Sequence, residues 1–321
     1  MSEFRVEVIR VGLIEKHPNA DTLGVTRVHD YPVITKIGEF AYDALAVYVP
    51  VDAVVPADDP RWGFLDGHRR IKAKRLRGVF SMGLLVPAPA GSEVGDDLAE
   101  VLRITKYEPP IELSTGGEAE RDPGFIPVYT DIESLRRWPG ILRPGEDVVV
   151  TEKIHGANAR FAFYGGRLWC GSRTQIKADI AASMWWQAAC RYDLASLLIH
   201  ASGHVFYGEI YGQVQDLRYD VPRSEGARLA FFDVLNIATR RYYDYDEASS
   251  MIARLGLPVA PILARGGWDP GLCSLAEGAS CLASNVREGI VVRPVVERFD
   301  ERIGRVILKL HGEGFLTRKG G

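Results

Sequence analysis

The stretch DVVVTEKIHGAN, residues 147–158, decides how we interpret the fold. Its first half, from Asp147 to Glu152, is apolar and rich in β-branched residues, which predicts a strand. Lys153 ends that strand, and Gly156 lies in the turn that follows. A rigid element would therefore hold this lysine in place. Taken alone, the same pattern also describes an ordinary solvated lysine at a strand end.

The sequence that surrounds this stretch predicts more strands than helices. Gly165-Gly166 lies between two short apolar runs and is a strong signal for a hairpin. Because strands outnumber helices and occur in hairpins, we expect an α+β domain built on antiparallel sheets with flanking helices. The expected strands are residues 147–152, 160–164, 167–169, 204–211, 228–235, 288–293 and 306–310. We expect one or two helices at residues 178–199, and one each at 246–255 and 274–283.

The first third of the chain has a different character. Short β-branched runs, at residues 4–13, 24–28, 44–49 and 83–86, are separated by prolines, and no long helical pattern occurs. This predicts an OB-like β-barrel. A segment rich in proline, glycine, serine and acidic residues then separates this first third from the rest of the chain. We expect a domain at residues 1–104, a linker at 105–126 and a second domain at 127–321.

Composition limits the classes of protein that the chain can represent. Of the 321 residues, 46% are hydrophobic and 25% are charged, which is ordinary for a globular protein. The net charge is -3, so a nucleic-acid binder would have to concentrate its basic residues locally. No apolar run is long enough to span a membrane, and the four cysteines form no C-x-x-C pair. We expect a monomeric, cytoplasmic protein with reduced thiols.

Charged residues interrupt several of the predicted apolar strands. Glu209, Glu288 and Lys309 each lie among apolar neighbours, as Lys153 does. Burying a charge is costly unless it is paired, so these residues form either two ordinary buried ion pairs or a functional site. A lysine nucleophile that attacks a phosphate needs such neighbours, because another lysine and a divalent cation lower its pKa and stabilise the developing charge. Phe232 could stack a base, although a core aromatic residue is the simpler interpretation.

Taken in order, these motifs resemble a known superfamily. Lys153-x-x-Gly156, Ser172-Arg173, the YGE at 207–209, the FFD at 231–233, the EGIV at 288–291 and Lys309 look like the motif set of covalent nucleotidyltransferases, which include ATP-dependent ligases and mRNA capping enzymes. The pair Glu152-Lys153 together with Asn158 resembles the RNA ligase branch. So do the segments at 106–110 and 129–133. The predicted N-terminal barrel is similar to the OB domain that some RNA ligases carry ahead of the catalytic domain.

The resemblance implies an ATP-dependent RNA ligase that uses Mg²⁺ or Mn²⁺. It would join 3′-OH and 5′-phosphate RNA ends, at nicks or breaks in RNA repair, through a lysyl-AMP intermediate and an adenylylated 5′ end. The implied roles are a nucleophile (Lys153), an adenine contact (Glu152), a partner of the metal's water shell (Asn158), a ribose or phosphate contact (Arg173), a ribose or metal ligand (Glu209), an adenine-stacking ring (Phe232), a metal-positioning carboxylate (Glu288) and an α-phosphate contact (Lys309).

Two positions depart from the family pattern. His155 occupies the place where the common Lys-x-Asp-Gly motif has a carboxylate, and we consider it with Glu209 and Glu288 as a candidate for the metal site. His311 occupies the place of a second lysine, where its charge near a phosphate would depend on pH. These departures keep open a catalytically weak RNA-binding or RNA-repair accessory protein. A DNA ligase or a capping-type nucleotidyltransferase is a further alternative, although both usually carry the OB domain after the catalytic domain.

A basic run lies in the N-terminal domain. It comprises Arg69, Arg70, Lys72, Lys74, Arg75 and Arg77. A solvated face is the usual explanation for such a run, but in a slightly acidic chain this local concentration favours contact with an RNA backbone. The HPNAD segment at 17–21 resembles a turn of tRNA-binding OB modules. A loop with proline and Asx-turn chemistry explains it equally well.

Overall fold

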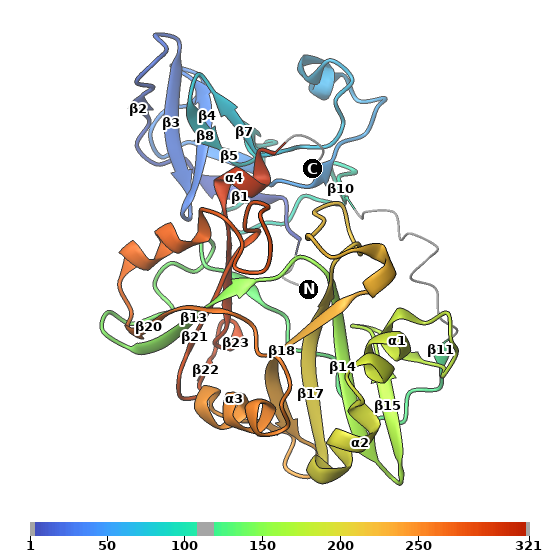
Figure 1. Ribbon diagram of the computed structural model, residues 1–321. Helices are drawn as coiled ribbons and strands as arrows, with labels where there is room; N and C mark the ends of the chain where they lie inside the picture. The colour runs from blue at the N-terminus through green and yellow to red at the C-terminus, as the bar shows by residue number, and fades with distance from the viewer. Residues whose placement is uncertain (1–3, 108–118, 319–321) are drawn as a thin grey trace. The chain divides into compact units, whose positions relative to one another are not determined.

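The computed structural model describes residues 4–107 and 119–318, and these fold as two compact units (Figure 1). Within the described ranges, the first unit comprises residues 4–107, 134–139 and 316–318, and the second comprises residues 119–133 and 140–315. Half of the predicted linker, residues 108–118, lies outside the described residues. The described parts of the linker contain two short strands, β10 (Thr105–Lys106) and β11 (Ala119–Glu120). The domain boundary itself stays a prediction.

The first unit consists of small antiparallel sheets. Its sheets have the strand orders β1-β5-β9, β2-β3-β4, β7-β8 and β10-β6. Apart from β10, the strands are β1 (Glu7–Arg10), β2 (Glu15–Lys16), β3 (Leu23–Val28), β4 (Tyr31–Lys36), β5 (Leu45–Val49), β6 (Ala53–Val54), β7 (Lys74–Leu76), β8 (Val79–Ser81) and β9 (Leu84–Pro87), with the 3₁₀ helix η1 (Pro60–Leu65) between β6 and β7.

The expected strand at residues 4–13 is shorter than predicted. Pairing with β5 covers only Glu7–Arg10, and Leu13 beyond it is 68% exposed. The alternation of apolar residues therefore continues past the point where β5 can supply ladder partners. The three other expected strands in this unit form close to their predicted bounds, as β3, β5 and β9.

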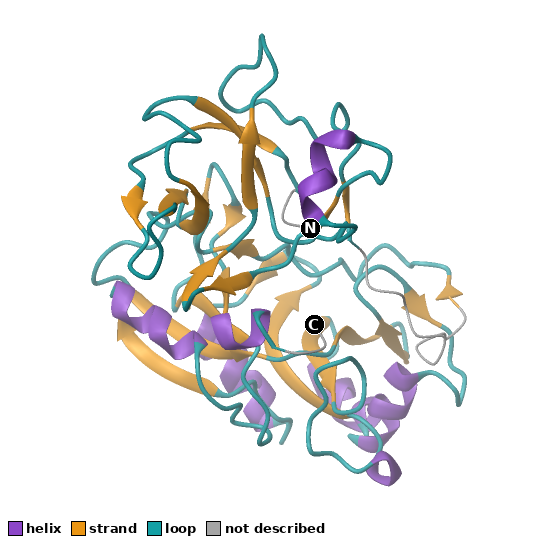
Figure 2. Cartoon of the chain, turned by 90° about the horizontal axis from the view of Figure 1, so that it is seen from above, coloured by secondary structure: helices purple, strands orange, loops and turns teal. Residues whose placement is uncertain are grey.

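The second unit contains two large antiparallel sheets, and its helices are short (Figures 1 and 2). The larger sheet has the order β11-β16-β15-β14-β17-β18-β19, and the smaller sheet has the order β12-β24-β21-β13-β20. Besides β11, the strands of the larger sheet are β14 (Ala157–Tyr164), β15 (Arg167–Gly171), β16 (Ile176–Lys177), β17 (His204–Tyr211), β18 (Arg228–Asn236) and β19 (Arg241–Tyr242). Those of the smaller sheet are β12 (Glu133–Ser134), β13 (Asp147–Lys153), β20 (Ile262–Gly267), β21 (Gly289–Pro294) and β24 (Leu308–His311). A separate hairpin pairs β22 (Phe299–Asp300) with β23 (Gly304–Arg305).

The predicted hairpin at Gly165-Gly166 is present and joins β14 to β15. Both glycines have positive φ, +63° and +80°, as a two-residue turn of type I′ requires. This turn fixes the register of β14 against β15. It also fixes which face of β14 each residue occupies, because side chains alternate along a strand.

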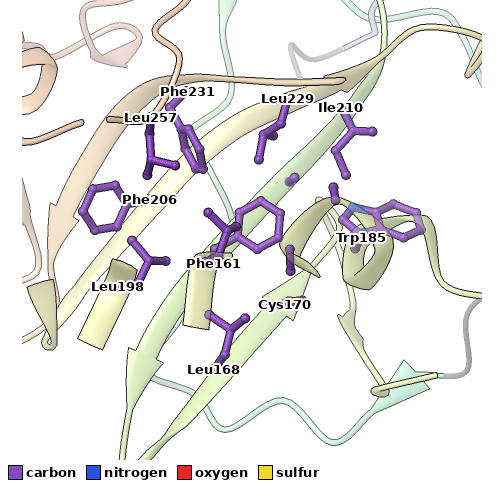
Figure 3. Close-up of a cluster of buried hydrophobic side chains, with 14 of the residues drawn as sticks. Phe161, Leu168, Cys170, Trp185, Leu198, Phe206, Ile210, Leu229, Phe231 and Leu257 are labelled. Atoms are coloured by element: carbon purple, nitrogen blue, oxygen red, sulfur yellow. The ribbon is translucent and has the colours of Figure 1, made fainter. Parts of the chain in front are cut away.

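One face of the larger sheet is covered by helices and forms an apolar core. Phe161, Phe206 and Phe231 point from β14, β17 and β18 into this cluster, and all three are fully buried (Figure 3). The helices of this unit are α1 (Met184–Arg191), α2 (Leu194–Leu198), α3 (Tyr245–Arg254) and α4 (Glu313–Leu316), with 3₁₀ helices η3 (Ile199–Ala201), η4 (Arg223–Glu225) and η5 (Pro270–Ala276). Because this face is filled by apolar packing, polar residues of the same strands lie on the opposite face.

A buried charge cluster lies at that opposite face. Asp233 of β18 is fully buried and accepts hydrogen bonds from the Tyr129 hydroxyl at 2.8 Å and from Arg305, whose Nη2 lies 2.7 Å away. Arg293 of β21 lies 3.2 Å from the same carboxylate, and Glu297 pairs with both arginines. The cluster therefore ties β18 of the larger sheet to β21 and β23.

Of the one or two helices expected at 178–199, two form, α1 and α2, and the first begins only at Met184. Asp193 separates them because it takes a left-handed conformation with φ +46°. The expected helix at 274–283 is wrong. The 3₁₀ helix η5 ends at Ala276, and Gly278 follows with φ +103°.

The irregular backbone after η5 is held by a side chain. The Arg287 guanidinium donates to the carbonyl oxygens of Leu275, Glu277 and Ala279, groups that a helix would have needed for its own hydrogen bonds. The side-chain hydrogen bonds of Arg287 thus replace the backbone hydrogen bonds of the helix that the apolar spacing predicted.

Candidate active site

Lys153 lies at the end of β13, opposite Gly289 of β21. Its Nζ donates a hydrogen bond to Glu288 Oε1 at 2.7 Å. Glycine is needed at the neighbouring positions, because a Cβ at Gly156 would lie 2.1 Å from the Ile210 carbonyl oxygen and one at Gly289 would lie 2.1 Å from that of Leu310. The turn after the lysine and the strand beside it therefore pack backbone against backbone, and this fixes where Nζ points.

Glu288 is the centre of the cluster. It immediately precedes β21 rather than lying within the strand as predicted, and its side chain is only 7% exposed. Oε1 lies 2.7 Å from Lys153 Nζ, 3.4 Å from His155 Nδ1 and 3.6 Å from His311 Nε2. Burial raises the pKa of this carboxyl, but Lys153 and the two histidines outweigh burial and hold the pKa well below its usual value. Glu288 is therefore an anion at neutral pH.

The second oxygen of Glu288 has a different environment. Oε2 is buried and has no hydrogen-bond partner among the described residues, and the same holds for Asn158 Oδ1. A buried acceptor without a partner costs free energy, so such atoms point to a ligand that the protein alone does not supply.

Lys309 and His311 lie beside the nucleophile in the smaller sheet. On β24 they pair with Val291 and Gly289, the residues of β21 that oppose Thr151 and Lys153. Because alternate residues of paired strands share a face, both side chains occupy the face that carries Lys153. Burial lowers the pKa of His311, and the positive charges of Lys153 and Lys309 lower it further, whereas Glu288 raises it.

The larger sheet contributes Glu209 and Asn158. The two residues are direct partners in the pairing of β14 with β17, so they share a face. Burial raises the pKa of Glu209 to about 8, and the Glu288 charge acts in the same direction, while Lys153 opposes both. A Cβ at Gly156 would lie 3.1 Å from Glu209 Cγ, so the Glu209 side chain lies against the turn that follows Lys153. Residues of both sheets therefore meet at one site.

Arg173 lies at the edge of this group. It pairs with Asp131, and its side chain is about half exposed. Buried Arg160 fixes the preceding residue, because its Nε donates to the Ser172 carbonyl at 2.9 Å. The charge of Arg173 lowers the pKa of Glu209, so Arg173 is close enough to act on the site electrostatically.

Glu152 points away from Lys153, as neighbours on a strand must. Its carboxylate accepts hydrogen bonds from the Ser280 hydroxyl and from the Cys281 amide, the latter at 2.7 Å, and Arg287 Nε lies 3.7 Å away. Glu152 therefore orders the irregular segment that follows η5. A role in contacting adenine stays a prediction.

Phe232 lies between two apolar clusters and is partly buried. Its ring meets Tyr129 edge to face, with the ring centroids 5.0 Å apart. The ladder with β17 shifts between Tyr207 and Gly208, which pair with Asp233 and Phe231, so Phe232 is an extra residue in β18. It packs with clusters other than the helix-covered core that contains Phe231. Stacking on a base stays a prediction for this ring.

The loop after β17 carries further residues of the site that no sequence motif predicted. Three of its residues contact the turn that follows Lys153. Asp216 Oδ1 lies 2.8 Å from His155 Nε2, the Tyr219 hydroxyl accepts from the His155 amide at 2.8 Å, and the Gln215 amide donates to the Gly156 carbonyl. The only signal in the sequence was a polar run directly after a strand that carries a buried glutamate.

The residues present fit a divalent cation bound together with phosphate. No group of three or more His, Cys, Asp or Glu side chains in the described part of the chain is arranged to hold a metal by itself. Mg²⁺, however, characteristically keeps several waters and takes one or two carboxylates plus substrate phosphates. The anionic Glu288, with its unpartnered Oε2, and the nearby Glu209 form such a donor set.

The basic run lies in the first unit, around the hairpin of β7 and β8. Lys72, Lys74, Arg75 and Arg77 are exposed. Arg70, in contrast, pairs with Asp52 and lies over the Tyr107 ring at 3.7 Å, and Arg69 donates to the Val55 carbonyl. The structure thus divides the run into a solvent-facing hairpin and two arginines that also support the fold.

The chain matches two protein families and several solved structures. The RNA ligase family matches residues 146–311, and an OB-fold domain family matches residues 5–88. The chain is similar to Naegleria gruberi RNA ligase with pyrophosphate, at 25% identity and a TM-score of 0.85, with 98% of each chain covered. Mutants of that ligase are also similar, one with ATP and Mn (25% identity, TM-score 0.83, 98% of each chain) and one with AMP and Mn (24%, 0.85, 98% of each chain). No curated protein sequence matches the chain.

These matches confirm two expectations from the sequence: the mixed α+β architecture with an N-terminal OB fold, and the resemblance to RNA ligases. No helix in the described part of the chain is long and apolar enough to cross a membrane. The RNA ligase match covers more than half of the chain and includes Lys153, Glu209, Glu288 and Lys309. The chain therefore belongs to the RNA ligase family.

Proposed function

We propose that this RNA ligase is ATP-dependent and joins 3′-OH and 5′-phosphate RNA ends through a lysyl-AMP intermediate on Lys153, with RNA repair as its role. The observation that carries the proposal is the contact of Lys153 Nζ with Glu288, whose other oxygen is buried without a partner. A nucleophilic lysine and a carboxylate with a free coordination position thus lie side by side. The similar Naegleria ligase structures that contain ATP and Mn support the choice of nucleotide and metal.

In the proposed first step, the deprotonated Nζ of Lys153 attacks the α-phosphorus of ATP. The new N–P bond forms as the bond to the bridging oxygen breaks, and pyrophosphate leaves with that electron pair. Lys309 and His311 lie on the same sheet face as Lys153 and can stabilise the charge that builds on the phosphate oxygens. When bound, Mg²⁺ or Mn²⁺ would be held by Glu288 and Glu209 and would supply further positive charge at the phosphate.

The next two steps move AMP and seal the RNA. A 5′-phosphate oxygen attacks the lysyl-AMP phosphorus, the N–P bond breaks, and Lys153 recovers its electron pair. The 3′-OH then attacks the 5′-phosphorus of the adenylylated end and releases AMP. Arg173 is about half exposed and its charge acts on Glu209, which supports a contact with the incoming 5′-phosphate or the ribose. Glu152, Asn158 and Phe232 keep their proposed roles at the adenine and at the metal's water shell.

We further propose that the exposed β7–β8 hairpin contacts the RNA backbone through Lys72, Lys74, Arg75 and Arg77. Such contacts are sequence-independent and release counterions from the RNA. Replacing Lys74 and Arg77 with alanine should weaken RNA binding and lower the slope of log K against log salt by about 2, since each lost phosphate contact lowers it by about 1. Lysyl-AMP formation should be unaffected. Arg10→Ala, which removes an exposed arginine paired with Asp43, is the matched control.

Labelling separates the proposal from its alternatives. The protein is incubated with α-labelled ATP or GTP and with Mg²⁺ or Mn²⁺, and covalent label is measured on the denatured chain. We expect label from ATP, none in Lys153→Ala, and normal label in Lys36→Ala, which changes an exposed lysine. Label from GTP alone would indicate a capping-type enzyme. No label from either nucleotide would indicate an accessory RNA-binding protein. Sealing of nicks with RNA or DNA at the 3′-OH side then distinguishes an RNA ligase from a DNA ligase.

A further inference from the structure

The loop after β17 places a carboxylate against the histidine of the nucleophile turn. Asp216 Oδ1 lies 2.8 Å from His155 Nε2. An ionised carboxylate has no proton to give, so Nε2 must carry the hydrogen and donate it. The other ring nitrogen, Nδ1, then faces Glu288 Oε1 at 3.4 Å. His155 is therefore a link between two carboxylates from different segments.

The ring of His155 has little freedom to turn. Its side chain is 12% exposed, and its ring packs against Phe315 with the centroids 5.4 Å apart. The His155 amide is bonded to the Tyr219 hydroxyl, so backbone and ring are held by the same loop. Packing limits the position of the ring, and the contact of Nε2 with Asp216 leaves Nδ1 as the nitrogen that faces Glu288.

This orientation has a consequence for Glu288. Oε1 is occupied by Lys153 and lies near both His155 and His311, whereas Oε2 has no partner within the described residues. A carboxylate fixed through one oxygen presents the other in a defined direction. Side chains behind a ligand group characteristically set its orientation, and losing them costs about 10–100-fold in metal affinity or activity.

We propose that Asp216 is a positioning residue for nucleotidyl transfer: through the Nε2–H of His155 it fixes the ring that, with Lys153, orients Glu288. This proposal rests on the function proposed above. It assigns a role to Asp216, which lies outside the sequence motifs that suggested that function. It also gives the histidine of the nucleophile turn a carboxylate partner from the neighbouring loop.

A double-mutant cycle tests the proposal. Asp216→Ala should slow single-turnover lysyl-AMP formation by about 10–100-fold, and Asp216→Asn, which keeps an acceptor oxygen, should recover part of the rate. In a His155→Asp background the Asp216→Ala change should have less than about a twofold effect, since the residue it acts through is gone. An equal loss in both backgrounds would show that Asp216 acts only by holding the loop.

Asp220→Ala is the matched control for loop packing. Asp220 is on the same loop but bonds the amide and hydroxyl of Ser284 instead of His155. Any rate loss from this change should be the same with histidine or aspartate at position 155. If the rate loss from Asp220→Ala depends on residue 155 as strongly as the rate loss from Asp216→Ala does, the proposal that Asp216 acts specifically through His155 is wrong.

A spectroscopic measurement keeps the inference independent of activity. Nitrogen-15 NMR of the imidazole should show His155 with hydrogen on Nε2 in the wild-type chain and a loss of that single state in Asp216→Ala, without nucleotide or metal. An unchanged His155 spectrum would refute the positioning role even if ligation is slowed. If the wild-type chain gives no lysyl-AMP but the NMR result holds, the proposed function fails while the positioning of His155 stands.

Discussion

Asp233 offers the sharpest quantitative test of how the second unit is held together. Its carboxylate is fully buried and is surrounded by Arg293, Arg305 and the Tyr129 hydroxyl. With Glu297 included, the four charged groups sum to zero. Asp233→Asn keeps the shape but leaves one net positive charge buried between the two sheets.

The expected cost follows from removing one partner of a buried ion pair. Such changes typically cost about 3–5 kcal/mol, and Glu297 remains as a counter-ion, so we take about 3 kcal/mol. For a unit of this size, 1 kcal/mol corresponds to about 2–4 °C in the melting temperature. Asp233→Asn should therefore lower Tm by about 6–12 °C, measured by circular dichroism at pH 7.

The same contact predicts how the difference depends on pH. Burial raises the pKa of Asp233, but Arg293 and Arg305 lower it by more, so the folded-state pKa lies below the ordinary value of 3.8. A depressed carboxyl pKa stabilises the fold above the unfolded-state pKa, and this contribution is lost as pH falls through the folded-state pKa. The gap between wild type and Asp233→Asn should be constant from about pH 5 to 8 and should narrow below pH 3.8.

Asp246→Asn is the control for this prediction. Asp246 pairs with Arg265 through two contacts of 2.7 Å, but both side chains are about half exposed. Exposed pairs contribute about 0.2–1 kcal/mol, so Tm should fall by at most about 4 °C. Equal shifts for the two variants, or a shift below about 2 °C for Asp233→Asn, would refute the claim that burial makes this cluster essential.

Three further predictions concern the site and the hairpin. Because the folded-state pKa of Glu209 is about 8 against an ordinary value of 4.5, the folded chain loses stability as pH rises between them; Glu209→Gln should raise Tm at pH 8 without metal, while slowing lysyl-AMP formation. Gly156→Ala places a Cβ 2.1 Å from the Ile210 carbonyl oxygen, so the nucleophile turn must move, and single-turnover lysyl-AMP formation should fall by about 100-fold. His17→Ala removes the hydrogen bond of the buried His17 ring to the Leu76 carbonyl, at 3.1 Å. Because one hydrogen bond contributes about 1 kcal/mol, amide exchange in the β7–β8 hairpin, measured by NMR, should accelerate by about fivefold or more.

Matched variants serve as controls. Glu247→Gln changes an exposed glutamate of α3 and should leave the pH profile of Tm unchanged. Gly140→Ala adds a Cβ that meets nothing within 4 Å and should leave the labelling rate unchanged. For His17, exchange in the β17–β18 pair is the internal reference. A Tm that falls in Glu209→Gln at pH 8, full activity in Gly156→Ala, or hairpin exchange that follows the internal reference would each contradict the reasoning.

Much of the fold was predictable where local patterns are self-sufficient. The hairpin at Gly165-Gly166 formed because the turn residues and the alternation of the flanking strands agree. β17 has the predicted bounds, His204–Tyr211. The expected helix at 274–283 does not form, because the Arg287 side chain donates hydrogen bonds to carbonyl oxygens of that segment. The spacing of apolar residues along the sequence does not reveal such a long-range hydrogen bond.

The sequence by itself indicated which residues are candidates for the chemistry of the site. Lys153 after a β-branched run, and Glu209 among apolar residues, are visible in one dimension because period and polarity are local properties. Only the tertiary structure decided their partners. Strand register placed Asn158 against Glu209, and sheet order placed Lys153 opposite Gly289, beside Glu288. The contact of Asp216 with His155, 61 positions apart, depends on how a loop closes over a turn, and no sequence spacing encodes that distance.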